Sequence, residues 1–169
     1  MGEARTEMKK KVKILAFDQA TKVSGYAVIE NGTLSEYDCI DLTKTKGTAE
    51  DRINRMAYEL WAIIDRVHPT LVVLEDVEMI SNMQAMIMLA RLLGRMQGYC
   101  VANGIEYKTY IPSAWRKVLG YQQGAGIKRA DLKQQSIAYA KKITGEELQE
   151  DTAEAVAIAH AALKDLKEI

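Results

Sequence analysis

The stretch from Val12 to Val28 reads V-K-I-L-A-F-D-Q-A-T-K-V-S-G-Y-A-V, and the fold prediction starts from it. An apolar run ends in Asp18, a turn follows, and a second apolar run begins at Gly25. The first run predicts a buried strand, which would hold a carboxylate on a rigid element where the strand reaches solvent. Asp18 is therefore a metal-ligand candidate, although a surface Asp in a hairpin turn gives the same pattern.

The composition indicates one domain with a single core. The chain has 169 residues, 48% of them apolar, two prolines and no low-complexity tract. We expect residues 1–11 to form a flexible basic tail and residues 12–169 to form the domain. No apolar run approaches the roughly 18 residues needed to cross a bilayer. Cys39 and Cys100 lack metal-ligand spacing, so we expect reduced cysteines and a cytoplasmic location.

Turn and capping signals divide the rest of the chain into elements. Asn31-Gly32 separates two apolar runs, and both residues tolerate the positive φ of a tight hairpin. Thr48 and Asp51 form a capping-box-like pair before a helix that His68-Pro69 ends. The predicted strands are residues 12–18, 25–30, 33–40, 71–74 and 105–110. The predicted helices are residues 48–67, 82–102, 113–119, 129–143 and 151–166.

This order of elements predicts an α/β fold with a five-stranded mixed sheet flanked by helices. The first three strands should form an antiparallel meander, and the crossover helix should place strand 71–74 parallel to a meander strand. If that neighbour is strand 12–18, Asp18 and Glu75 emerge side by side at one sheet edge.

Asp151 and Glu154 lie on one face in the first turn of the last helix. Acids at this position also stabilise the helix dipole, by ~0.3–1 kcal/mol, without any other role. Beside Asp18 and Glu75 they would form a group of four carboxylates whose repulsion divalent cations relieve. Oxygen ligands favour Mg²⁺ or Mn²⁺, and two such ions support phosphodiester hydrolysis.

The formal net charge is zero, but its distribution is uneven. Residues 105–133 carry a net charge of +4, and residues 141–169 carry −3. This pattern suits phosphate binding on one surface, or a solvated face without a partner. The Gly-rich loop 120–126 fits neither a nucleotide P-loop nor a dinucleotide fingerprint, and suits a contact with the nucleic-acid backbone. The candidate DNA-binding residues are Lys108, Arg116, Lys117, Lys128, Arg129 and Lys133.

The helix expected over residues 82–102 has hardly any polar face. A helix that is apolar nearly all round is buried on more than one side. Deep burial within a monomer or a Met-rich cofactor groove would each satisfy this pattern. We favour a homodimer through this helix, because 169 residues leave little material for another covering layer.

Three motifs resemble those of the RuvC Holliday junction resolvases, which have an RNase H-like fold. The first is the stretch from Asp18 to Gly25, the second is Leu74-Glu75-Asp76-Val77, and the third begins D-T-A-E-A-V at Asp151. Segment 110–133 resembles the junction-binding region of that family. The resemblance covers roughly residues 12–166.

The resemblance implies a homodimeric magnesium-dependent endonuclease that makes paired, symmetric cuts in four-way DNA junctions. Each active site would hold two ions through Asp18, Glu75, Asp151 and Glu154, which would also be the catalytic residues. Asp76 would point the other way along its strand and is kept as a reserve ligand.

The chain departs from the family pattern at three places. It has Gln19-Ala20 where the family has Pro-Gly, and Glu154 where bacterial members often have Asp. Glu78, Met79 and Ile80 stand where bacterial members carry an aromatic wedge, which favours action on branched DNA more broadly, as in bacteriophage-encoded relatives. The rival hypotheses are a nuclease for RNA or RNA–DNA hybrids and a catalytically idle junction-binding protein.

Overall fold

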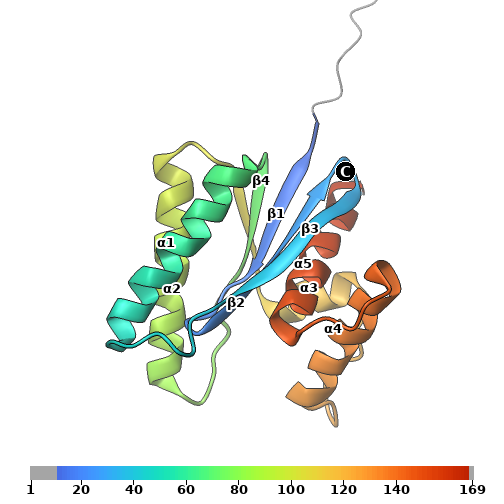
Figure 1. The fold of residues 1–169 in the computed structure, drawn as a ribbon. Helices are drawn as coiled ribbons and strands as arrows, with labels where there is room; N and C mark the ends of the chain where they lie inside the picture. Colours follow the sequence, from blue (N-terminus) through green and yellow to red (C-terminus); the bar gives the residue numbers. More distant parts are fainter. Residues whose placement is uncertain (1–10, 168–169) are drawn as a thin grey trace, which may run out of the picture.

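The computed structural model describes residues 11–167, which form a sheet between two layers of helices (Figure 1). Residues 1–10, most of the expected basic tail, and residues 168–169 lie outside the described part. The strands are β1 (Lys13–Asp18), β2 (Val23–Glu30), β3 (Thr33–Asp41), β4 (Leu71–Glu75) and β5 (Tyr107–Tyr110). The helices are α1 (Ala49–Val67), α2 (Met83–Ala102), α3 (Pro112–Val118), α4 (Arg129–Thr144) and α5 (Glu150–Lys167).

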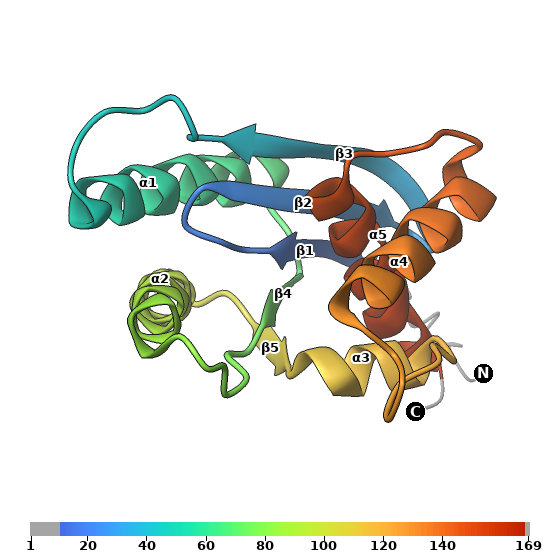
Figure 2. The same cartoon turned by 90° about the horizontal axis from the view of Figure 1, so that it is seen from below.

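The five strands lie in the order β3-β2-β1-β4-β5. β1, β2 and β3 are antiparallel neighbours, β4 is parallel to β1, and β5 is parallel to β4. This arrangement confirms the predicted mixed sheet, and it places the ends of β1 and β4 at one edge. In Figure 2 this edge is seen with α2 on one side and α4 on the other.

Local sequence signals account for the element boundaries. Asn31 and Gly32 have φ values of 53° and 84°, as the hairpin between β2 and β3 requires. The N–H of Asp51 donates to Thr48 Oγ1 at 3.1 Å, and the N–H of Thr48 donates to Asp51 Oδ2 at 2.8 Å, which confirms the capping box. His68 adopts the left-handed conformation at the end of α1.

Side chains along each strand point alternately to the two faces of the sheet, so the core forms two clusters, one on each face. Leu15 and Phe17 of β1 pack with α1 and α2 on one face. Ile14 and Ala16 pack with α3, α4 and α5 on the other. α5 is buried through small residues, mostly alanines, so its backbone lies close to the sheet.

Gly25 of β2 marks the closest approach of α5 to the sheet. A Cβ atom at this position would lie only 1.9 Å from the carbonyl oxygen of Asp151. Only glycine fits such an approach, so Gly25 allows the first turn of α5 to pack beside β1 and β2.

Helix α2 is buried on one side within the single chain. Its fully buried residues are Leu92, Leu93, Met96 and Cys100, all on the side that packs against the core. The opposite side stays exposed in the single chain. No helix within residues 11–167 is long and apolar enough to cross a membrane.

Candidate active site

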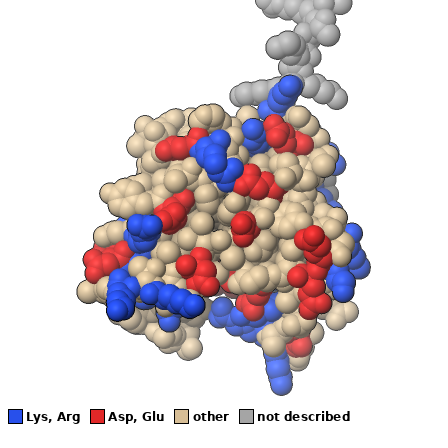
Figure 3. Space-filling view, in the orientation of Figure 1, with Lys and Arg blue, Asp and Glu red and all other residues tan. Residues whose placement is uncertain are grey.

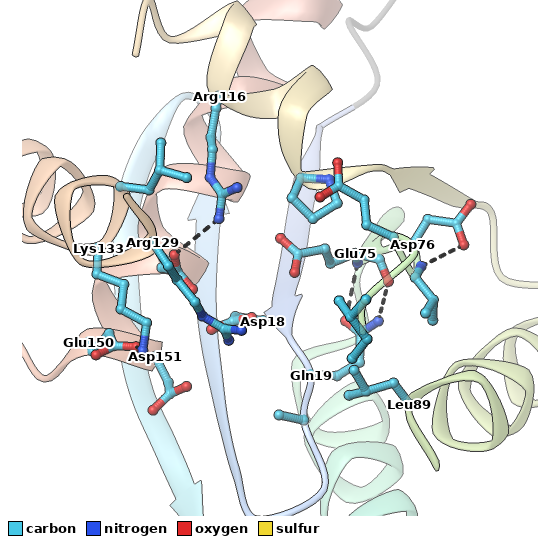
Figure 4. Close-up of a pocket in the computed structure, with 17 residues that line it drawn as sticks. Asp18, Gln19, Glu75, Asp76, Leu89, Arg116, Arg129, Lys133, Glu150 and Asp151 are labelled. Carbon is cyan, nitrogen blue, oxygen red and sulfur yellow. Dashed lines mark hydrogen bonds and ion pairs between the residues drawn. The ribbon is translucent and has the colours of Figure 1, made fainter. Parts of the chain in front are cut away.

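A cavity of about 380 Å³ opens at the sheet edge where β1 and β4 end. The four acids predicted from the sequence all line it: Asp18 ends β1, Glu75 ends β4, and Asp151 and Glu154 lie in the first turns of α5. Figure 4 shows side chains from both sheet and helix directed into this space. The fold therefore brings together carboxylates that lie more than a hundred residues apart in the chain.

Asp18 and Glu154 form the buried centre of the site, with 7% and 8% of their surface exposed. Burial raises the pKa of Asp18 well above its ordinary value, and the carboxylates of Glu154, Glu75 and Asp151 raise it further. Burial also raises the pKa of Glu154, and this carboxylate can accept a hydrogen bond from a protonated Asp18. Without a cation, the two groups therefore favour sharing a proton.

Glu75 is held from two sides. The indole Nε1–H of Trp115 donates to Glu75 Oε2 at 2.7 Å. Burial raises the pKa of Glu75 to about 7, against the opposing effect of the Trp115 hydrogen bond. The position of this carboxylate is thus fixed by α3 as well as by β4.

The side chain of Gln19 joins the ends of β1 and β4. The backbone pairing between the two strands reaches only Ala16 and Val73. Beyond it, Gln19 Nε2 donates to the carbonyl of Glu75 at 2.5 Å, and the N–H of Glu75 donates to Gln19 Oε1 at 3.1 Å. The amide group takes the place of a peptide unit of a neighbouring strand, so it continues the sheet pairing up to the site.

Three further acids, Asp76, Glu78 and Glu150, border the cavity but face other partners, and Glu150 pairs with Lys133. Figure 4 shows the Asp76 carboxylate turned away from Asp18, and its Oδ1 accepts from the N–H of Val77 at 2.8 Å. Glu78 accepts from the N–H of Ser113 at 3.2 Å. Asp76 therefore points away from the site, as predicted from its place next to Glu75 along the chain.

The six candidate DNA-binding residues occupy different surroundings. Arg116, Arg129 and Lys133 line the cavity, and Arg116 Nη2 lies 3.6 Å from Glu154 Oε1. Lys117 and Lys128 lie outside the cavity lining, and Lys108 pairs with Asp165 at 3.2 Å. Acidic and basic side chains are interspersed across the face seen in Figure 3, so this face carries no continuous patch of one sign.

The oxygen donors fit a divalent cation, although the described residues contain no closed group of three such side chains around a single point. Glu154 Oε1 is buried and has no hydrogen-bond partner among the described residues. Burial raises the pKa values of Asp18 and Glu154, the neighbouring carboxylates raise that of Asp18 further, and Arg116 offsets only part of this at Glu154. A cation between Asp18 and Glu154 would supply both the missing partner and the missing charge.

Sequence reasoning did not identify Gln19 and Trp115 as parts of the site. In the sequence, Gln19 appears only as a departure from the Pro-Gly of the family, and no motif includes Trp115. Their contacts with Glu75 depend on pairings across 56 and 40 residues, which no local pattern reports.

Comparisons with known proteins agree with this geometry. The protein-family model described as "Crossover junction endodeoxyribonuclease RuvC" matches residues 14–161. Thermus thermophilus RuvC in complex with a Holliday junction substrate superposes with a TM-score of 0.73 at 16% identity, over 93% of this chain and 96% of that one. Comparison with curated proteins gives no match.

Two further resolvases, one from a virus and one from mitochondria, share the fold. The fowlpox virus resolvase, solved with Holliday junction DNA, has a TM-score of 0.63 at 14% identity, over 92% of this chain and 99% of that one. The yeast mitochondrial Holliday junction resolvase Ydc2 has a TM-score of 0.56 at 16% identity, over 90% and 79%. With the family model matching most of the chain and a carboxylate site at the expected sheet edge, the chain belongs to the RuvC family of crossover junction endodeoxyribonucleases.

Proposed function

We propose that this chain is a structure-selective endonuclease that resolves Holliday junctions and other branched DNA by metal-dependent phosphodiester hydrolysis. Its place of action would be the cytoplasm of a bacterial or phage-infected cell. The observation that carries the proposal is the convergence of Asp18, Glu75, Asp151 and Glu154 on one cavity that also contains Arg116, Arg129 and Lys133. A site with both signs of charge suits a phosphate group bound through cations.

Asp18, Glu75, Asp151 and Glu154 would hold two Mg²⁺ ions, with Mn²⁺ as a possible substitute. Such a pair of ions activates water and stabilises the leaving oxygen of an in-line displacement. Trp115 and Gln19 hold Glu75 in place, so that its carboxylate needs little reorganisation on binding. The roles of the four acids as ligands and catalytic groups are part of the proposal.

Basic residues around the acids would hold the DNA backbone. Arg116 and Arg129 reach the cavity itself and would contact the phosphate that is cut, with Lys133 beside them. Lys117 and Lys128, which lie outside the cavity, would contact flanking phosphates. Lys108 would have to leave Asp165 to do so, and we expect it to contribute least.

The active unit would be a homodimer through α2, because two symmetric cuts need two sites. The exposed side of this helix carries residues at spacings of three and four, which form one stripe. The stripe consists of Met83, Ile87, Ala90, Gly94, Gly98 and Val101. An apolar stripe with small residues at its centre lets a second helix approach closely, as packing between two copies requires.

A nuclease panel tests the proposal. A four-way DNA junction, a forked DNA duplex and an RNA–DNA hybrid of equal length are incubated with the protein, with Mg²⁺ or with a chelator. We expect cutting of the two branched DNAs with Mg²⁺ and none with chelator. Equal or faster cutting of the hybrid would replace the resolvase proposal with that of a hybrid nuclease.

The variant Asp18→Asn separates an enzyme from an idle binding protein. We expect cutting of the junction to fall by at least a thousandfold, on the order seen when a central catalytic group is lost, while junction binding persists or tightens. Asp38→Asn, an exposed acid on β3, is the matched control and should cut like the wild type. Unchanged cutting by Asp18→Asn would refute the proposed site.

A further inference from the structure

Three exposed lysines lie on the α1 side of the strand ends. Lys22 belongs to the turn between β1 and β2, and Lys44 and Lys46 belong to the loop between β3 and α1. None of the three forms an ion pair with an acid of residues 11–167. Figure 2 shows both segments on the side of α1, whereas α4 lies on the other side of the sheet. We call these residues the α1-side lysines.

Backbone contacts between the two segments place the α1-side lysines beside the active site. The N–H of Leu42 donates to the carbonyl oxygen of Lys22 at 2.7 Å, so the β3–α1 loop begins next to the β1–β2 turn. The N–H of Thr45 donates to the carbonyl oxygen of Leu42 at 3.0 Å, which turns the chain around Lys44. Ala20 lines the active-site cavity and precedes Lys22 by two residues, a backbone separation of about 7 Å at most. The lysines therefore border the cavity that holds the carboxylates.

The acids nearest to these lysines in the chain are already engaged. Asp41 accepts hydrogen bonds from the N–H and the hydroxyl of Thr43, at 2.9 and 2.6 Å. These hydrogen bonds, with a smaller contribution from Lys44, lower the pKa of Asp41. Asp51 caps α1, and Glu50 pairs with an arginine of α2. The charge of the α1-side lysines is therefore available to an anion outside the chain.

The α4 side of the site carries a comparable group of cations. Lys128 and Arg129 at the start of α4 are exposed and also form no ion pair within the described part of the chain. α1 and α4 pack on opposite faces of the sheet, so the carboxylates lie between two groups of cations. This distribution suits a polyanion that runs past the site on both sides, rather than a single phosphate bound in it.

We propose that the α1-side lysines bind backbone phosphates of the DNA on the side of the cut that faces away from α4. The inference rests on the proposed function. A DNA strand carries one phosphate for every ~3.4 Å of helix axis, so a strand held at the carboxylates extends phosphates to both sides of the cut. Cations on the α4 side alone would leave one half of this strand without a counter-charge. The α1-side lysines would supply it.

The chemistry of lysine indicates contacts with phosphates rather than with base edges. Its ammonium group is a point charge on a flexible stem, which binds phosphate without a fixed bidentate geometry. Phosphate contacts set the position and orientation of a protein on DNA and carry no sequence information. The α1-side lysines would therefore fix how the DNA lies relative to the cut, whatever its sequence.

The first test removes the three charges together. The variant Lys22→Ala/Lys44→Ala/Lys46→Ala is titrated with a four-way junction in EDTA, so that no DNA is cut, at several salt concentrations. Each lost phosphate contact reduces the slope of log K against log salt by about 0.9, so we expect the slope to fall by about 2 to 3. Junction binding at low salt should weaken about tenfold or more.

A matched control removes three exposed lysines from the last turns of α4 and α5. Lys142, Lys164 and Lys167 lie roughly 20 Å or more along these helices from Arg129 and Asp151. Their triple alanine variant should bind with the wild-type slope, and melting curves confirm that both variants are folded. Equal losses in the two triple variants would show a general effect of net charge and would overturn the inference.

A second measurement locates the contacts on the DNA. Single phosphates of the junction are ethylated, and those whose ethylation prevents binding are identified. The wild type should require phosphates on both sides of the cut, and the α1-side variant should lose this requirement at two or three phosphates on one side only. Lys128→Ala/Arg129→Ala should lose it on the other side. A requirement that stays the same in the α1-side variant would overturn the inference.

The outcome is separable from that of the proposed function. Cutting of the same junction by the wild type in Mg²⁺ is measured in parallel. Cutting by the wild type, together with an unchanged salt slope in the α1-side variant, leaves the nuclease in place and removes the inference. Junction binding that depends on the lysines, without any cutting, would refute the nuclease and support the phosphate site.

Discussion

Helices α2 and α5 have similarly apolar sequences but different surroundings in the fold. Ten of the eighteen residues of α5 are buried, against four of the twenty residues of α2. α5 lies between the sheet and α3 and α4, and its alanines leave no room for larger side chains. α2 packs through one side only, with Gly94 and Gly98 open to solvent.

The difference shows that apolar composition alone does not distinguish burial within one chain from burial between chains. The small residues of α5 bring Asp151 and Glu154 to the strand ends, where chemistry requires a fixed geometry. The small residues of α2 face outward, where only a helix of a second copy would pack against them. The predictions below test each side of this contrast.

The largest effect is expected for Gly25→Ala, because α5 is packed between the sheet and the helices α3 and α4 and cannot shift away from β2. The new Cβ would lie 1.9 Å from the carbonyl oxygen of Asp151, so β2 and α5 must separate. We expect the free energy of unfolding to fall by about 3 kcal/mol and cutting to fall about a hundredfold or more. Urea denaturation and junction cleavage measure the two effects.

Gly98→Ala is the matched control on α2. Within one chain no atom lies within 4 Å of a Cβ at this position, and alanine is a better helix former, so the free energy of unfolding of the monomer should rise by about 0.5–1 kcal/mol. Close packing against a second copy would be hindered, so unfolding is measured at a concentration where the protein is monomeric. Equal effects of the two substitutions would show that α5 is no more tightly packed than α2.

Gln19→Leu tests the link between β1 and the β4 strand that leads to α2. Both hydrogen bonds to the backbone of Glu75 would be lost. We expect the Mg²⁺ concentration for half-maximal cutting to rise about 10- to 100-fold, as for other residues that support metal ligands. Gln134→Leu, at an exposed position of α4, should leave it unchanged. An unchanged metal requirement for Gln19→Leu would contradict the positioning role.

Gly98→Glu tests whether the exposed side of α2 is a dimer interface. Light scattering of the wild type should report twice the mass of one chain. We expect the charged variant to dissociate at least tenfold more readily, because a carboxylate would be buried between helices without a partner. Gln134→Glu adds the same charge on α4 and should remain dimeric. Wild-type protein that is monomeric at micromolar concentration would rule out this interface.

The smallest effect is a pH dependence of stability in the absence of metal. Folding raises the pKa of Glu75 from 4.5 to about 7, and it also raises that of Asp18, so the folded protein binds more protons than the unfolded chain. Stability from these groups is complete below their ordinary pKa values and is lost as the pH rises through about 7. We therefore expect the melting temperature in EDTA to fall across this range.

The contribution of the site is isolated by comparing variants. Asp18→Asn should flatten the fall in melting temperature, whereas Asp38→Asn should leave it unchanged. Partial burial lowers the pKa of His160, which acts in the opposite direction and is common to both variants. Because Glu75 still titrates in Asp18→Asn, only a slope that persists in the double variant Asp18→Asn/Glu75→Gln would show that the carboxylates of the site are not its cause.

The fold followed from the sequence wherever a local signal fixed one geometry. Asn31-Gly32 fixed the hairpin, and the Thr48–Asp51 pair fixed the start of α1. The crossover rule predicted β4 parallel to one of the first three strands. The structure shows that β1 is this neighbour, so Asp18 and Glu75 end at the same edge. Strand boundaries were less accurate, since β2 begins two residues earlier and β5 two residues later than predicted.

The rest of the site depends on contacts that no local pattern contains. Gln19 matters through the backbone of Glu75, and Trp115 through its carboxylate. Lys108 contributes to a basic segment in the sequence, but the fold pairs it with Asp165 of α5. The apolar sequence of α2 predicts burial on more than one side; within one chain only one side is covered, and the partner for the other side stays a prediction.

Half of the acidic residues of the site lie on α5, which follows every other described element in chain order. Domains fold progressively as the ribosome releases the chain from its N-terminus. A nascent chain that has reached only α4 carries Asp18 and Glu75 but lacks Asp151 and Glu154. Cutting would therefore require α5 to be complete, and we expect a chain truncated before this helix to bind no metal pair and to leave DNA uncut.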